Sequence, residues 1–113
     1  MTPRGLRESL EDIVDAISEI NSFVRGITFE DFLSNREKVL AVVKLLEIIG
    51  EATKKIPGEL RNKYPEIPWS SVAGMRDILV HEYWQVDVEV VWQTIEESLP
   101  ELARVISEMI REN

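Results

Sequence analysis

The residues best suited to chemistry lie within one short stretch, MRDILVHEYW, at positions 75–84. It contains the only histidine of the chain, His81, with Arg76 five residues before it and Tyr83 two residues after it. A histidine with a pKa near ~6.5 can accept and donate a proton at neutral pH. An arginine can bind a phosphate through two parallel hydrogen bonds and stabilise charge that develops on it. Such a pair suits metal-free cleavage of RNA, in which the 2′-hydroxyl of the RNA is the nucleophile.

The apolar residues within this stretch predict that it forms a buried helix. On an unbroken helix, Asp77 and His81 are four residues apart and share a face, so the carboxylate could fix the imidazole tautomer. Arg76 and His81 lie about 140° apart around the same helix and cannot easily face one small group. Either the helix loosens near His81, or two copies of the motif meet in a symmetric dimer.

The residues alone leave a purely structural role open. His81 would then be a partly buried histidine, paired with Asp77 and packed beside Trp84. Arg76 would be a surface or interface ion-pair residue, and Tyr83 a core aromatic with its hydroxyl at the surface. For an isolated His-x-Tyr pattern in a helical protein, this structural interpretation is the favoured one.

The composition narrows the functional classes. A length of 113 residues predicts a single domain, 1–113. The chain has no cysteine, which excludes disulfides, thiol catalysis and thiolate metal sites, and with one histidine we expect no metal site. The net charge of −8 argues against broad, non-specific binding of nucleic acid, so any contact with RNA must be local.

No targeting or membrane-spanning segment is expected from the sequence. The first residues, MTPRGLRESLEDIV, lack the apolar core of a signal peptide. The longest apolar stretch, VLAVVKLLEII, is short and is broken by Lys44 and Glu47. A cytoplasmic protein is the simplest interpretation.

Apolar residues at steps of three and four predict two long helices before the motif, at about 4–25 and 34–55. Gly26 is a plausible stop for the first, and Ser34 with Glu37 has the spacing of a capping box for the second. The second helix has a very wide apolar face, which favours burial against the core and against a second subunit. Its clearly polar stripe consists of Lys44, Glu47, Glu51, Lys54 and Lys55. Gly50 within it predicts a close packing contact.

After the motif, Asp87 is expected to cap a further helix. Pro100 should end or kink that helix, and Ser98 with Glu101 again has capping-box spacing, so a helix or kinked continuation is expected from Leu99 to about Arg111. No strand pattern competes. The sequence therefore predicts an all-α domain, an up-and-down four-helix bundle with extra short helices.

The motif and its surroundings resemble the HepT-like toxins of the HEPN superfamily. The R-x4-H-x-Y pattern is formed by Arg76, His81 and Tyr83, and by itself it is short. Four blocks in the usual family order accompany it: ITFEDF at 27–32, LLEIIGEATKKIP at 45–57, IPWSSVAGMRDILVHEYW at 67–84 and VDVEVVWQTI at 86–95. The resemblance therefore covers nearly the whole chain.

This resemblance implies a two-fold homodimer in which Arg76 and His81 of both subunits share one cleft. It also implies a metal-independent endoribonuclease without cofactors, the toxin of a toxin–antitoxin pair, with RNA as its substrate. Its implied partner is a nucleotidyltransferase antitoxin of the MNT class, which silences the toxin by transferring AMP to Tyr83. Asp77 would support His81. The acidic balance keeps a second function open, a non-catalytic helical partner of a nucleotidyltransferase that binds a nucleotide or RNA.

Overall fold

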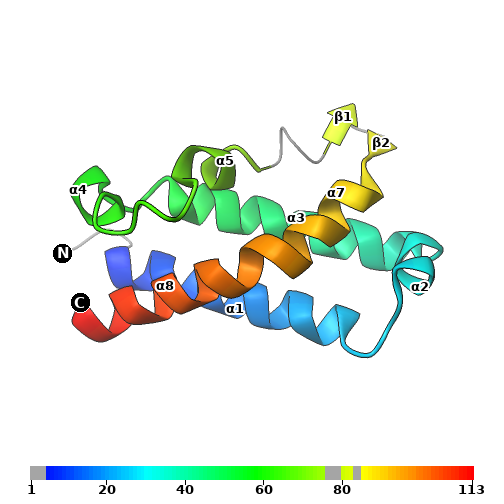
Figure 1. The fold of residues 1–113 in the computed structure, drawn as a ribbon, viewed down its shortest axis with the longest axis horizontal. Helices are drawn as coiled ribbons and strands as arrows, with labels where there is room; N and C mark the ends of the chain where they lie inside the picture. The colour runs from blue at the N-terminus through cyan, green and yellow to red at the C-terminus, as the bar shows by residue number, and fades with distance from the viewer. Residues whose placement is uncertain (1–4, 76–79, 83–84) are drawn as a thin grey trace.

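The fold, seen in a computed structural model, is built almost entirely from helices (Figure 1). The structure describes residues 5–75, 80–82 and 85–113, and only the backbone of 80–82. In chain order the elements are α1 (Leu6–Val24), α2 (Phe29–Leu33), α3 (Arg36–Thr53), α4 (Gly58–Arg61), α5 (Trp69–Ala73), β1 (Val80–Glu82), β2 (Gln85–Val86), α7 (Val88–Gln93), the π-helical turn η1 (Thr94–Ser98) and α8 (Leu99–Glu112). The predicted all-α class is confirmed.

Three long helical segments form the body of the molecule: α1, α3 and the run α7–η1–α8 (Figure 1). α1 packs against both α3 and α8, and the shorter helices α2 and α5 pack on α3. The core lies between these segments and is made of apolar side chains on their inner faces. Its fully buried members include Leu10, Ile13 and Ile20 of α1, Leu46 and Ile49 of α3, and Leu102, Ile106 and Met109 of α8.

The ends of the first two long helices are set by local polar contacts. α1 ends before Gly26, whose φ of 75° is in the left-handed region, so the predicted stop is confirmed. The predicted capping box of Ser34 and Glu37 is wrong. Asn35 is the N-cap of α3 and accepts the backbone N–H of Lys38 at 3.0 Å. The Ser34 hydroxyl instead donates to the carbonyl of Asp31 in α2, since α2 ends at Leu33 and Ser34 is its C-cap.

The C-terminal helix is continuous across Pro100, with a π-helical turn in front of it. The backbone N–H of Leu99 donates to the carbonyl of Thr94, five residues earlier. Ser98 makes no side-chain capping bond, so the predicted capping box is wrong. The helical backbone continues from η1 into α8, as the alternative of a continuation expected. Proline removes one N–H from the helical ladder, and both proline and π-helical turns are sites where helices depart from regular geometry.

The motif stretch departs from its predicted helix. Val80–Glu82 and Gln85–Val86 pair as two antiparallel strands, with Val80 opposite Val86 and Glu82 opposite Gln85. The helix predicted for 75–84 is therefore wrong at 80–82, and so is the expectation that no strand is present. A short apolar run does not distinguish helix from strand by its periodicity, and valine favours strands.

Gly50 makes the close contact that its position in a helix predicted. A Cβ atom added there would lie 3.1 Å from the carbonyl oxygen of Val72 and 3.2 Å from that of Ala73. We expect Gly50→Val to lower the free energy of unfolding by about 1–3 kcal/mol, because the backbone of α5 would have to move. Urea denaturation measures this loss.

Gly58 provides the matched control, because a Cβ added there meets nothing within 4 Å. Gly58→Val is expected to change the free energy of unfolding by less than about 0.5 kcal/mol. Equal losses for the two variants would show that the contact between α3 and α5 has no energetic weight.

Candidate active site

The chain that leads into the motif is held by two contacts of α5. The indole Nε1–H of Trp69 donates to the carbonyl oxygens of Arg61 and Tyr64, both at 3.0 Å. α5 also packs closely on α3, because its backbone lies next to Gly50 of that helix. α5 ends at Ala73 with Gly74 as its C-cap, and the next side chain, Met75, is 5% exposed. The backbone is therefore anchored up to the residue before Arg76.

The connection between α4 and α5 is tied to the far end of α8. The Tyr64 hydroxyl donates to Glu112 Oε1 at 3.3 Å, and burial, followed by the charge of Glu112, raises the pKa of this tyrosine. Arg104 bridges Glu66 at 3.0 Å to Glu108 at 3.1 Å, and it also binds the neighbouring carboxylate of Glu101. These contacts join the connection between α4 and α5, which leads into Trp69, to α8.

The segment that follows the motif is also anchored to the helical body. Asp87 accepts the backbone N–H of Val90 at 3.2 Å and begins α7, so the predicted cap is confirmed. The Trp92 ring then packs against Phe32, with ring centroids 5.2 Å apart, and against Phe29 at 5.9 Å. The motif stretch is thus a segment whose two ends are bound to the helical body.

The structure describes only part of the predicted site. Arg76, Asp77 and Tyr83 lie outside the described residues, and of His81 only the backbone is described, in β1. Because Val80–Glu82 is extended, the angle between Arg76 and His81 that an unbroken helix would give does not apply. The predicted pair of Asp77 and His81 stays a prediction.

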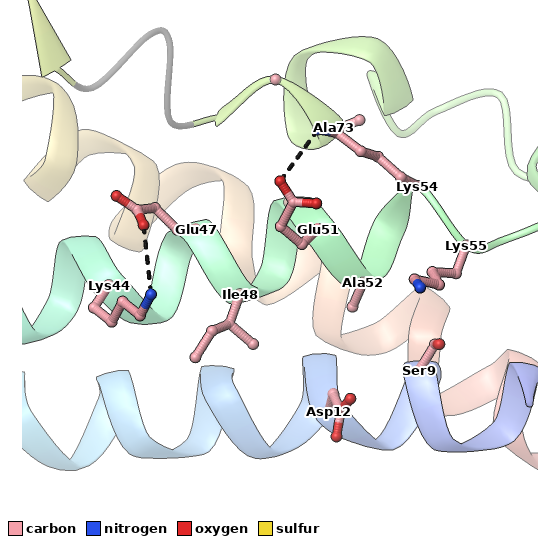
Figure 2. A pocket seen from close by; sticks show the side chains of 12 residues that line it. Ser9, Asp12, Lys44, Glu47, Ile48, Glu51, Ala52, Lys54, Lys55 and Ala73 are labelled. Atoms are coloured by element: carbon pink, nitrogen blue, oxygen red, sulfur yellow. Dashed lines mark hydrogen bonds and ion pairs between the residues drawn. The ribbon is translucent and has the colours of Figure 1, made fainter. Parts of the chain in front are cut away.

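Beside the motif lies a groove that the sequence had not revealed. It is a cavity of about 500 Å³ between α1, the polar stripe of α3 and the end of α5 (Figure 2). Its polar side chains are Ser9, Asp12, Lys44, Glu47, Glu51, Lys54 and Lys55. The sequence shows that the stripe is polar, but no pattern in the sequence indicates that α1 faces it. Among the described residues, no cluster of three or more histidine or acidic side chains could hold a metal ion.

Fold and site together define a small helical domain that presents one histidine on a segment anchored at both ends. The chain belongs to the HepT-like ribonuclease family, since the family model "Ribonuclease HepT-like" matches residues 13–109. The family prediction made from the motif is therefore confirmed, and with it the assignment to an enzyme family.

Curated relatives agree with this assignment. The chain is 50% identical over 99 residues to "Probable ribonuclease HepT" of Thermococcus cleftensis, covering 88% of this chain and 90% of that protein. It is 40% identical over 112 residues to "Putative RNase MJ1216" of Methanocaldococcus jannaschii, covering 99% and 93% of the two chains. No solved structure shows a significant match. Within the described residues, no helix is long and apolar enough to cross a membrane.

Proposed function

We propose that this protein is a metal-independent endoribonuclease and the toxin of a toxin–antitoxin pair, with Arg76 and His81 as its catalytic residues. The observation that carries the proposal is the complete R-x4-H-x-Y motif in a chain of the HepT-like ribonuclease family. The anchoring of the chain at Met75 and Asp87 supports it, because catalytic side chains need a rigid frame.

The reaction would use the 2′-hydroxyl of the RNA as nucleophile. One His81 imidazole removes the proton of this hydroxyl, and the oxygen attacks the adjacent phosphorus. The bond from phosphorus to the 5′-oxygen breaks, and that oxygen receives a proton from a protonated imidazole. Arg76 stabilises the extra negative charge on the phosphoryl oxygens. The products are a 2′,3′-cyclic phosphate and a 5′-hydroxyl.

A symmetric homodimer would supply two histidines and two arginines to one cleft. The wide apolar face of α3 supports such an assembly, since Leu40 on this helix remains 45% exposed. In the dimer, the His81 of one subunit could act as the base while that of the other acts as the acid.

Cleavage assays with single-stranded RNA in the presence of EDTA test this function. We expect cleavage, with a cyclic phosphate at the new 3′ end, and no cleavage where the nucleotide before the cut is 2′-deoxy. Cleavage of the 2′-deoxy substrate, or loss of cleavage with EDTA, would contradict the mechanism.

The chain's net charge of −8 favours a second candidate, a helical partner of a nucleotidyltransferase that binds RNA or a nucleotide without cutting it. The same assay separates the two functions. Binding of RNA without turnover under any condition would favour this second candidate.

Tyr83 is the proposed site of inactivation by an MNT-type nucleotidyltransferase antitoxin. An AMP group there would add bulk and negative charge close in sequence to Arg76 and His81, and would repel an RNA phosphate. After co-expression with such an enzyme, intact mass spectrometry is expected to show AMP adducts on the wild type and none on Tyr83→Phe. An adduct that persists in Tyr83→Phe would place the modification elsewhere.

A further inference from the structure

We propose that the groove between α1, α3 and the end of α5 binds a phosphodiester group of the RNA strand beside the cut, through Lys55 and Ser9. The inference rests on the proposed ribonuclease function and adds a binding site for its substrate. Four features of the groove support it: its position, its free cation, its buried hydroxyl and its balance of charge.

The groove is placed to continue the path of a strand that crosses the motif. Gly74 lines it, and Arg76 follows only two residues later in the chain. α3 runs along the groove from Lys44 to the turn at Lys55, a helical length of about 16 Å at 1.5 Å per residue. Nucleotides next to the one being cut could therefore lie along α3.

Lys55 provides a positive charge that the described part of the chain leaves unpaired. Lys54 is paired with Glu51 at 3.2 Å, and Lys44 is 3.9 Å from Glu47 (Figure 2). For Lys55, by contrast, no ion pair or hydrogen bond of the side chain occurs with any described part of the protein. Its ammonium group lies across the hollow from Ser9 (Figure 2). A phosphate there would gain a cation without breaking an existing pair.

Ser9 provides a hydrogen-bond donor inside the groove. The residue is only 2% exposed, yet it lines the cavity from the α1 side. Across residues 5–75, 80–82 and 85–113, nothing is hydrogen-bonded to its hydroxyl. Because Ser9 lines the groove, a phosphate oxygen there would accept a hydrogen bond from its hydroxyl. Ser9 and Lys55 could therefore bind the same phosphate from two sides.

The charge of the groove fits a single-stranded ligand with few phosphate contacts. Three lysines face three carboxylates, those of Asp12, Glu47 and Glu51, so the groove is neutral within a chain of net charge −8. A duplex or a long polyanion would need more cations. The carboxylates can accept hydrogen bonds from the amino groups of unpaired bases. Single-stranded RNA exposes these amino groups, whereas base pairing occupies them in a duplex.

Lys55→Gln tests the site in the full-length protein. With single-stranded RNA, we expect the KM of cleavage to rise about tenfold, with a smaller change in kcat, because the contact lies beside the reacting phosphate. We also expect the slope of log KM against log salt concentration to fall by about 0.7, the value for one phosphate contact on a single strand. Ser9→Ala should raise KM without altering that slope, because it removes no charge.

Lys38→Gln is the matched control, since it removes the same charge from the first turn of α3, outside the groove. Neither its KM nor its salt slope should change. If Lys55→Gln behaves like Lys38→Gln, the proposal is overturned.

A binding assay separates this inference from the proposed reaction. The dissociation constant of a fluorescent oligonucleotide that is 2′-deoxy at the cut can be measured without turnover. Weaker binding by Lys55→Gln but not by Lys38→Gln supports the groove, even if the wild type cleaves no RNA. Equal binding by both variants overturns the groove even if cleavage is confirmed.

Discussion

Arg76→Ala and His81→Ala are each expected to reduce the rate of RNA cleavage by about 10²–10⁴-fold. His81→Ala removes the group that transfers protons to and from the RNA oxygens. Arg76→Ala removes the charge that stabilises the phosphoryl oxygens as negative charge develops on them. Single-turnover cleavage of a labelled RNA in EDTA measures both losses, because it reports the chemical step apart from product release.

Thermal denaturation of the same variants distinguishes catalysis from a structural role. If His81 were only a buried partner of Asp77, its loss would cost about 1–3 kcal/mol of stability and leave the chemistry to other groups. We expect the melting temperature to stay within a few degrees while cleavage is lost. A variant that cleaves as well as the wild type would show that the residue is not catalytic.

The pH dependence of cleavage gives an independent check on His81. With one imidazole acting as base and a second as acid, kcat/KM should fall on both sides of neutral pH. In His81→Ala, any residual cleavage should lose this bell shape. An unchanged profile would assign the proton transfers to other groups.

Phe32→Ala is expected to produce the largest loss of stability, about 3–5 kcal/mol. The Phe32 side chain is fully buried, and its ring lies 5.2 Å from that of Trp92. Removing it would leave a cavity and release α2 from α7, the helix that follows the motif. Urea denaturation measures the change in the free energy of unfolding.

Leu33→Ala is the matched control, because Leu33 follows Phe32 in α2 but is 53% exposed. We expect a change of less than about 0.5 kcal/mol. If both variants lost the same stability, the effect would come from the helical preference of α2 and not from its packing. We do not expect equal losses, because alanine has the highest helix propensity and its introduction should not weaken α2.

Local patterns in the sequence predicted those structural features that depend on residues close together in the chain. The two long helices before the motif follow from apolar side chains at steps of three and four. The stop at Gly26 and the cap at Asp87 depend on one backbone angle and one side-chain hydrogen bond. Gly50 was also predictable, because glycine inside a helix is costly unless another backbone comes close.

The incorrect structural predictions concern residues whose types fit two different local structures. Ser34 and Asn35 are both good caps, and the choice between them depends on where α2 ends. Pro100 could end a helix or bend it, and the packing of α8 on α1 favours the continuous form. Val80 and its neighbours suit either a buried helix or a strand, and pairing with Val86 decides for the strand at 80–82.

By itself, the sequence determined the helical class, most helix positions and the residues that could do chemistry, because each depends on residue type and short spacing. Tertiary structure alone decided that α1 faces the polar stripe of α3, and thereby that the buried Ser9 and the cationic Lys55 share one groove next to the motif. Ser9 and Lys55 are 46 positions apart, and no period or motif relates them. Such a pair appears only once helix packing brings distant segments together.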